Sequence, residues 1–132
     1  MNRSDTRLRV LVVEDCRDTA ETLRYLMDLW GHDVCLAKNG SAAVALAPAF
    51  RPNVVLIDIG LPGPNGFEVA RRMAHIPGMS PPVLVAATGY DGSTIRRDAD
   101  DVAFDHFLSK PFDLGLLRSI LSGARSSVPM DN

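Results

Sequence analysis

The stretch Arg9–Asp15, which reads RVLVVED, sets the pattern for the whole chain. Its apolar, β-branched run predicts a strand over Arg9–Val13 that is buried on both faces, as in a parallel sheet. Two acidic residues follow at the point where this strand would end. Apolar residues then recur at helical spacing across Asp18–Trp30, and Gly31 ends that predicted helix.

The same alternation of strand and helix continues along the chain. Further strands are predicted over Asp33–Ala37, Asn53–Ile57, Pro82–Ala86 and Phe104–Leu108. The next helix is predicted over Ser41–Leu46, ending by Pro48, and another is capped by Asn65 and ended by Pro77-Gly78. A helix over Ser93–Asp101 has only a weak apolar pattern. The last helix is predicted to be capped by Asp113 and ended by Gly123, and its inward residues are Leu114, Leu117, Ile120 and Leu121. Five β-α units with right-handed crossovers predict an α/β fold, a doubly wound five-stranded parallel sheet with five helices.

Composition excludes several classes of protein. The chain has 132 residues, of which 46% are hydrophobic and 23% charged, so we expect one globular domain rather than disorder or coiled coil. The net charge of −2 offers no basic surface for direct nucleic-acid binding. The apolar runs are far shorter than the roughly 20 residues of a membrane helix, so no membrane partner is expected. Two cysteines make no disulfide framework, and a reducing, cytoplasmic location is the default.

Polar residues with complementary chemistry follow four of the predicted strands. Glu14-Asp15 end the first strand, Asp58 the third, Thr88 the fourth and Lys110 the fifth. Each alone has an ordinary explanation, as a solvated edge, a helix cap, a turn residue or a surface charge. Their occurrence together at four strand ends is hard to explain by chance. Doubly wound sheets bind ligands at the carboxyl ends of their strands, so these residues indicate a functional site.

The chemistry of these residues fits one reaction. Neighbouring carboxylates repel one another, and a hard divalent cation such as Mg²⁺ relieves that repulsion. A carboxylate with an open face can also act as a nucleophile and form an aspartyl phosphate. The ammonium of Lys110 and the hydroxyl of Thr88 would then neutralise or hydrogen-bond the phosphoryl oxygens.

At these residues the sequence resembles a known family. Glu14-Asp15, Asp58 with Leu61-Pro62 and Gly66 after it, Thr88-Gly89, and Lys110-Pro111-Phe112 resemble the receiver domain of two-component response regulators. The resemblance implies the flavodoxin-like strand order 2-1-3-4-5 and covers nearly the whole chain. We therefore expect a receiver domain over 9–121, an N-terminal extension over 1–8 and a short tail over 122–132. The resemblance is compatible with two subtypes, a single-domain receiver like the chemotaxis regulator and a receiver of the hybrid-kinase type.

The resemblance also implies a role for each site residue. Asp58 would be the phosphoacceptor, and Asp15 and Asp58 would bind Mg²⁺ or Mn²⁺ directly. Glu14 would reach the metal through water, and the backbone carbonyl of Gly60 would be the third protein ligand. Thr88 and Lys110 would hold the phosphoryl oxygens.

Two further roles concern what happens after phosphorylation. Phe107, three residues before Lys110, matches the family's aromatic switch position and would rotate inward as Thr88 moves toward the phosphoryl group. Gly60 and Tyr90 occupy the positions that influence phosphoryl lifetime, and we expect Tyr90 to shield Asp58 partly and slow hydrolysis.

The resemblance implies protein partners rather than enzymatic turnover. A histidine kinase, a histidine phosphotransfer protein or both would supply the phosphoryl group, and the chain would hydrolyse it only slowly. An unknown downstream protein would read the switched surface. A weak homodimer is possible through the helix Ser93–Asp101, the strand Phe104–Leu108 and the last helix. No output domain fits in this length, so we expect signalling through the chain's own surface unless it is cut from a larger hybrid protein.

Three alternatives remain open. A haloacid-dehalogenase-type phosphatase also uses a strand-end Asp with Mg²⁺, but it expects a second Asp where this chain has Gly60. A flavin or nucleotide binder would need a phosphate-binding loop where Glu14-Asp15 lie. A receiver used only for docking, without phosphorylation, is disfavoured by the intact acidic set.

Overall fold

The computed structural model of the chain describes residues 7–59, 66–88, 104–110 and 112–127. Its strands are β1 (Arg9–Val13), β2 (Asp33–Ala37), β3 (Val54–Asp58), β4 (Val83–Thr88) and β5 (His106–Ser109). They form one parallel sheet in the order β2-β1-β3-β4-β5. The predicted fold class and strand order are confirmed.

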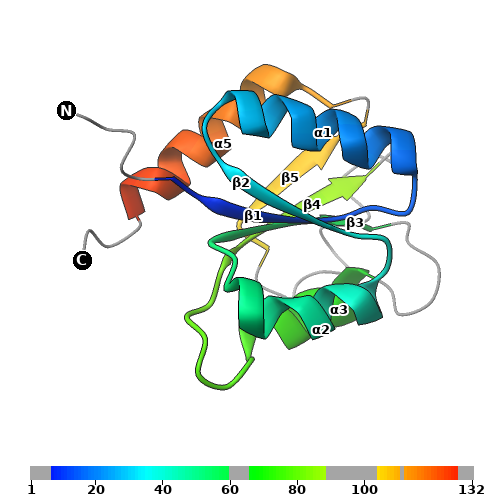
Figure 1. Ribbon diagram of the computed structural model, residues 1–132, viewed down its shortest axis with the longest axis vertical. Coiled ribbons are helices and arrows are strands. Elements are labelled where there is room, and N and C mark those ends of the chain that lie inside the picture. Colours follow the sequence, from blue (N-terminus) through cyan, green and yellow to red (C-terminus); the bar gives the residue numbers. More distant parts are fainter. Residues whose placement is uncertain (1–6, 60–65, 89–103, 111, 128–132) are drawn as a thin grey trace.

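Helices cover both faces of this sheet. They are α1 (Arg17–Leu29), α2 (Gly40–Phe50), α3 (Gly66–Ala74) and α5 (Leu114–Ser127). Figure 1 shows α1 and α5 on one face and α2 with α3 on the other, with the strands between them. The fifth predicted helix, Ser93–Asp101, lies outside the described residues, as does Asn65, the predicted cap of α3. No helix in the described part of the chain is long and apolar enough to cross a membrane.

Two apolar layers hold the helices to the sheet. Alternate strand residues point to opposite faces, so Val10 and Val12 pack toward α1 and α5, while Leu11 and Val13 pack toward α2 and α3. All five residues of β3 are buried, because this strand lies in the middle of the sheet. The apolar runs of the sequence thus form the core that holds the strands in place.

The predicted end of α2 was wrong. Pro48 was expected to stop the helix, but α2 continues through it to Phe50. Pro48 lies in the last turn, where its missing N–H removes only one helical hydrogen bond. Ala47 is fully buried and Phe50 packs against the core, and this packing favours the extra turn. Arg51 then ends the helix in a left-handed conformation with φ of 55°.

The last helix also differs from its prediction. Gly123 does not end it, since Ala124 beyond is buried in the core and the helix runs to Ser127. Leu114 does not face inward but is 41% exposed. The predicted cap is confirmed, because Asp113 Oδ1 accepts a hydrogen bond of 3.0 Å from the Leu116 N–H.

The limits of β3, β4 and β5 differ from their predictions by one or two residues. Asp58 and Thr88 are the final residues of β3 and β4 rather than the residues that follow them. β5 begins at His106, two residues later than predicted. At the N-terminus, Leu8 is fully buried although it falls in the predicted extension. Buried core residues thus lie before position 9 and after position 121, namely Leu8 and Ala124.

Candidate functional site

Strand register brings the first and third strand ends together. Val13 of β1 pairs with Ile57 of β3, so Glu14 and Asp58 follow side by side. The N–H of Glu14 donates to the Ala37 carbonyl at 3.0 Å, which extends the β1–β2 ladder by one residue. On the other side, the N–H of Ile59 donates to the Ala87 carbonyl at 2.9 Å and fixes the backbone just after Asp58.

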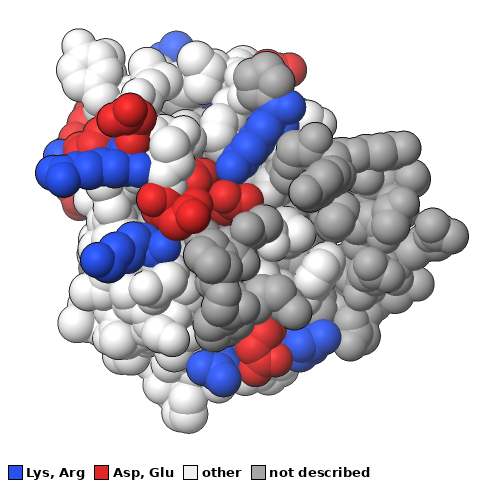
Figure 2. Space-filling model, turned by 90° about the vertical axis from the view of Figure 1, so that its right-hand side faces the viewer, with Lys and Arg blue, Asp and Glu red and all other residues white. Residues whose placement is uncertain are grey.

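Three carboxylates meet at this edge of the sheet. One carboxylate oxygen from each of Glu14, Asp15 and Asp58 lies within 4.8 Å of the others. Glu14 is 5% exposed and Asp58 8% exposed, whereas Asp15 is open to solvent. Figure 2 looks onto this side of the molecule and shows carboxylates gathered near its centre with basic side chains around them.

Lys110, just after β5, completes the cluster. Its Nζ lies 2.9 Å from Asp58 Oδ2 and 3.3 Å from Glu14 Oε1, so one ammonium bridges two buried carboxylates. Glu14 Oε2 in turn accepts a hydrogen bond of 3.1 Å from the Cys16 N–H at the start of α1. The cluster thus links residues from the ends of three strands.

The electrostatics of the cluster follow from its burial. Burial raises the pKa of the Glu14 carboxyl, and the charge of Asp58 adds to this rise, while the Cys16 N–H and Lys110 act in the opposite direction. Partial burial by itself lowers the pKa of the Lys110 ammonium. The hydrogen bond to Asp58 and the charges of Glu14 and Asp58 outweigh that effect, so the pKa of Lys110 is raised and its positive charge is kept.

The donor set fits a magnesium ion. Mg²⁺ takes oxygen ligands at about 2.0–2.1 Å and retains several waters, so one or two carboxylates suffice as direct ligands. Oxygens on opposite sides of such an ion lie about 4 Å apart, and one carboxylate oxygen from each of the three acids lies within 4.8 Å of the others. Two of the acids are buried in one cluster, and a cation would offset their mutual repulsion.

Four of the predicted site residues are therefore brought together: Glu14, Asp15, Asp58 and Lys110. Thr88 ends β4 and pairs in register with Ser109, one residue before Lys110, but its side chain is outside the description. Gly60 and Tyr90 also lie outside the described residues. Phe107 lies in β5, half-buried, with its ring next to that of Phe104.

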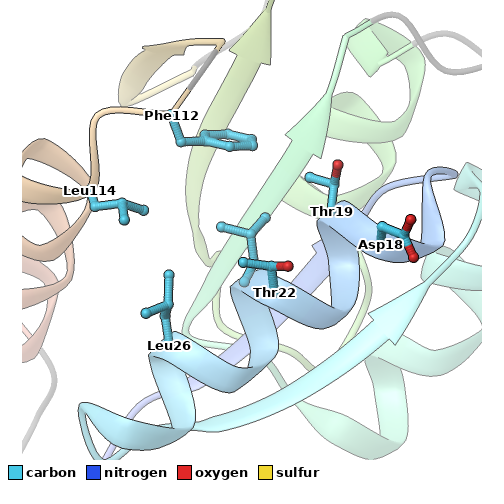
Figure 3. A pocket seen from close by; sticks show the side chains of 7 residues that line it. Asp18, Thr19, Thr22, Leu26, Phe112 and Leu114 are labelled. Carbon is cyan, nitrogen blue, oxygen red and sulfur yellow. The ribbon is translucent and has the colours of Figure 1, made fainter.

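The structure also has a groove that the sequence did not predict. It has a volume of about 310 Å³ and lies between α1 and the start of α5. Figure 3 shows Thr19, Thr22 and Leu26 of α1 facing Phe112 and Leu114 across it. Its walls are mostly apolar, and Asp18 in the first turn of α1, three residues after Asp15, also lines it. The groove depends on Leu114 being exposed, whereas the amphipathic pattern had placed this residue inward.

A family model of the response regulator receiver domain matches residues 10–122. The chain belongs to this family. It is a phosphoacceptor receiver of two-component signalling. The phosphatase and docking-only alternatives are not favoured.

Curated relatives agree with this membership. The chain is 35% identical to the response regulator MprA of Mycolicibacterium vanbaalenii over 94% of its own length, and it spans 53% of that relative. It is 32% identical to the protein PilH of Pseudomonas aeruginosa, covering 87% of this chain and 98% of PilH. The receiver thus makes up about half of one relative and nearly all of the other.

Solved receiver structures share the fold. A CheY-like receiver domain from Methylobacillus flagellatus has a TM-score of 0.81 at 26% identity, over 89% of this chain and 98% of that one. The receiver domain of the sensor histidine kinase PA1611 from Pseudomonas aeruginosa has a TM-score of 0.80 at 23% identity, over 91% and 98%. That structure holds a magnesium ion coordinated in its active site cleft.

Proposed function

We propose that Asp58 accepts a phosphoryl group from the phosphohistidine of a kinase or phosphotransfer protein. The observation that supports this most is the buried cluster itself, in which Lys110 pairs directly with Asp58 Oδ2 at 2.9 Å. In the proposed step, a carboxylate oxygen of Asp58 forms a bond to phosphorus while the bond from phosphorus to the histidine nitrogen breaks. The electron pair of that bond stays on the imidazole, which regains a proton.

The metal site belongs to the same proposal. Asp15 and Asp58 would bind Mg²⁺ or Mn²⁺ directly, Glu14 through a water molecule, and Gly60 through its backbone carbonyl. When bound, the ion would offset negative charge on the transferring phosphoryl oxygens. The close carboxylate oxygens of Glu14, Asp15 and Asp58 support this assignment, as does the magnesium ion in the PA1611 receiver.

The remaining residues would act on the phosphorylated state. Lys110 would hold one phosphoryl oxygen by its ammonium, and Thr88 another by its hydroxyl. Phe107 would change orientation with Thr88 and so switch the surface near β5. Gly60 and Tyr90 would set the phosphoryl lifetime, with slow hydrolysis by the chain itself.

The groove between α1 and α5 is a candidate binding site for the protein that donates the phosphoryl group. It begins at Asp18 and Thr19, one turn after Asp15, and its far wall holds Phe112, two residues after Lys110. A protein that presents a phosphohistidine to Asp58 would extend over these apolar walls. We propose that this transfer takes place in the cytoplasm. The switched surface would then bind an unidentified downstream protein or form a weak homodimer.

Intact mass spectrometry tests the proposal. The chain is incubated with Mg²⁺ and acetyl phosphate, and we expect one phosphoryl group to be added. Asp58→Asn removes the nucleophile and should abolish the addition, whereas Asp28→Asn, a change at an exposed acid of α1, should not. Wild-type chain that gains no phosphoryl group from acetyl phosphate or phosphoramidate would contradict the proposal.

A further inference from the structure

Three phenylalanine rings form a continuous row on the α2 and α3 side of the sheet. The rings of Phe67 in α3 and Phe104 have centroids 5.9 Å apart at 74°, an edge-to-face contact. The rings of Phe104 and Phe107 lie 5.7 Å apart at 56°. Both distances fall in the range that aromatic pairs favour. Phe107, the proposed switch residue, is thus held to α3 through Phe104.

Phe104 is fixed at its own position. It packs against the core between the sheet and the α2–α3 layer. The next residue, Asp105, is tied to Leu84 of β4 by two hydrogen bonds of 2.8 Å, one from each backbone N–H. The backbone that carries Phe104 is therefore anchored, and its ring offers Phe107 a rigid surface.

The other end of the row lies near the phosphoacceptor. Phe67 follows Gly66, where a Cβ would lie 3.1 Å from the Cα of Ile59 and 3.0 Å from its Cδ1. Ile59 is the residue directly after Asp58. The start of α3 therefore packs closely against the residue after Asp58, and ring contacts continue from Phe67 to Phe104 and Phe107.

We propose that Phe104 is a positioning residue for Phe107. Its ring stabilises the Phe107 orientation that accompanies the direct ion pair between Asp58 and Lys110. This inference rests on the proposed function, in which Phe107 takes a second orientation when Asp58 is phosphorylated. Because a contact made in only one of two conformations biases their equilibrium, Phe104 opposes the phosphorylated conformation.

The test compares Phe104→Leu with Phe50→Leu. Leucine keeps apolar bulk at position 104 but removes the ring. Phe50, at the end of α2, packs against the same core and serves as the matched control. Affinity for beryllium fluoride, which mimics a phosphoryl group on a carboxylate, is measured in the presence of Mg²⁺. The ring resonances of Phe107 are followed by NMR in selectively labelled protein.

We expect Phe104→Leu to bind beryllium fluoride about two- to tenfold more tightly than wild type, the range for loss of one aromatic pair. The Phe107 resonances should shift in the free variant, and Phe50→Leu should change neither quantity. In a Phe107→Leu background, Phe104→Leu should have no effect on affinity. A purely structural role for Phe104 would leave the affinity unchanged or weaken it.

Equal or weaker binding by Phe104→Leu, with wild type binding normally, would overturn this inference and leave the proposed function standing. Absence of binding by wild type would overturn the proposed function and this inference with it. Should Phe104→Leu fail to fold, Phe67→Leu releases Phe104 from α3 and is expected to tighten binding by a smaller factor. Unchanged affinity in that variant would equally overturn the inference.

Discussion

Glu14 and Asp15 are adjacent acids with opposite surroundings. Glu14 is buried, accepts a hydrogen bond from the Cys16 N–H and pairs with Lys110. Asp15 is exposed, and no hydrogen bond or ion pair holds its carboxylate within the part of the chain that the structure describes. A change at Asp15 should therefore affect mainly metal binding, whereas a change at Glu14 should affect the stability of the fold. Each residue supports a distinct prediction.

Asp15→Asn should change the response to magnesium and little else. Without divalent ions we expect its free energy of unfolding within about 0.5 kcal/mol of wild type, as for other surface changes. Magnesium at a hundred times its Kd should stabilise wild type by about 2.7 kcal/mol and the variant far less. Urea unfolding with and without Mg²⁺ checks this, with Asp18→Asn as a neighbouring exposed control. Equal stabilisation of Asp15→Asn and wild type would contradict the metal site.

Glu14→Gln should change the pH dependence of stability. The pKa of Glu14 is raised in the folded state above its ordinary value of 4.5. As the pH rises, this carboxyl therefore ionises in the unfolded chain before it ionises in the folded one. The stability contributed by the protonated carboxyl is then lost as pH climbs through the folded pKa. Glutamine does not ionise, so the variant does not lose this stability. The free energy of unfolding of the variant minus that of wild type should therefore be larger at pH 7 than at pH 4. Urea unfolding at both pH values, without divalent ions, measures the difference, and a gain that is not larger at pH 7 would refute the assignment.

Elements were predictable where burial dominates and less so at their ends. β1 follows its predicted limits and is a run of buried apolar residues after Arg9. β2 also follows its predicted limits, although only its last residue, Ala37, is buried. Pro48 and Gly123 misled the prediction of two helix ends, since burial of Ala47 and Ala124 outweighs local helix-breaking tendency. Tertiary packing of that kind is not visible in local sequence.

Gly66 illustrates why a motif residue is needed at the start of α3. A Cβ there would lie 3.1 Å from the Cα of Ile59, a backbone atom that cannot easily move. We predict that Gly66→Ala destabilises the chain by about 1–3 kcal/mol, the usual cost of overpacking. Gly123→Ala is the matched control, because nothing lies within 4 Å of its Cβ position and helix propensity favours alanine by about 0.5–1 kcal/mol. Denaturant unfolding measures the free energy of unfolding of both variants. Stabilisation by Gly66→Ala would contradict the prediction and show that Ile59 moves to make room for the added Cβ.

The groove between α1 and α5 makes a prediction about partner specificity. Leu114 is 41% exposed and lines the groove, while Leu116 on the same helix is 43% exposed and does not line it. Leu114→Lys should slow phosphotransfer from a phosphorylated histidine protein about tenfold, the effect of losing roughly 1.4 kcal/mol of contact. It should leave the rate with acetyl phosphate unchanged.

Leu116→Lys is the control and should change neither rate. Stopped-flow or gel-based transfer assays with both phosphodonors measure these rates. Equal slowing with acetyl phosphate would show damage to the site itself, and normal transfer from the histidine protein would exclude the groove as a donor contact.

At the scale of the whole molecule, topology makes the site. Residues 14, 58 and 110 are distant in sequence and meet because β1, β3 and β5 end at the same edge of a parallel sheet. Sequence could predict which residues converge, since that follows from strand direction alone. It could not predict that Lys110 bridges both Asp58 and Glu14, or that three phenylalanine rings line up, because these depend on side-chain packing.

The central claim is that Asp58 carries the phosphoryl group, and borohydride reduction tests it most directly. Borohydride converts an aspartyl phosphate to homoserine, which peptide mass spectrometry locates. After incubation with Mg²⁺ and acetyl phosphate we predict homoserine at position 58, and none when EDTA replaces Mg²⁺. Homoserine at position 15 instead, or no conversion anywhere in the magnesium sample, would contradict the account.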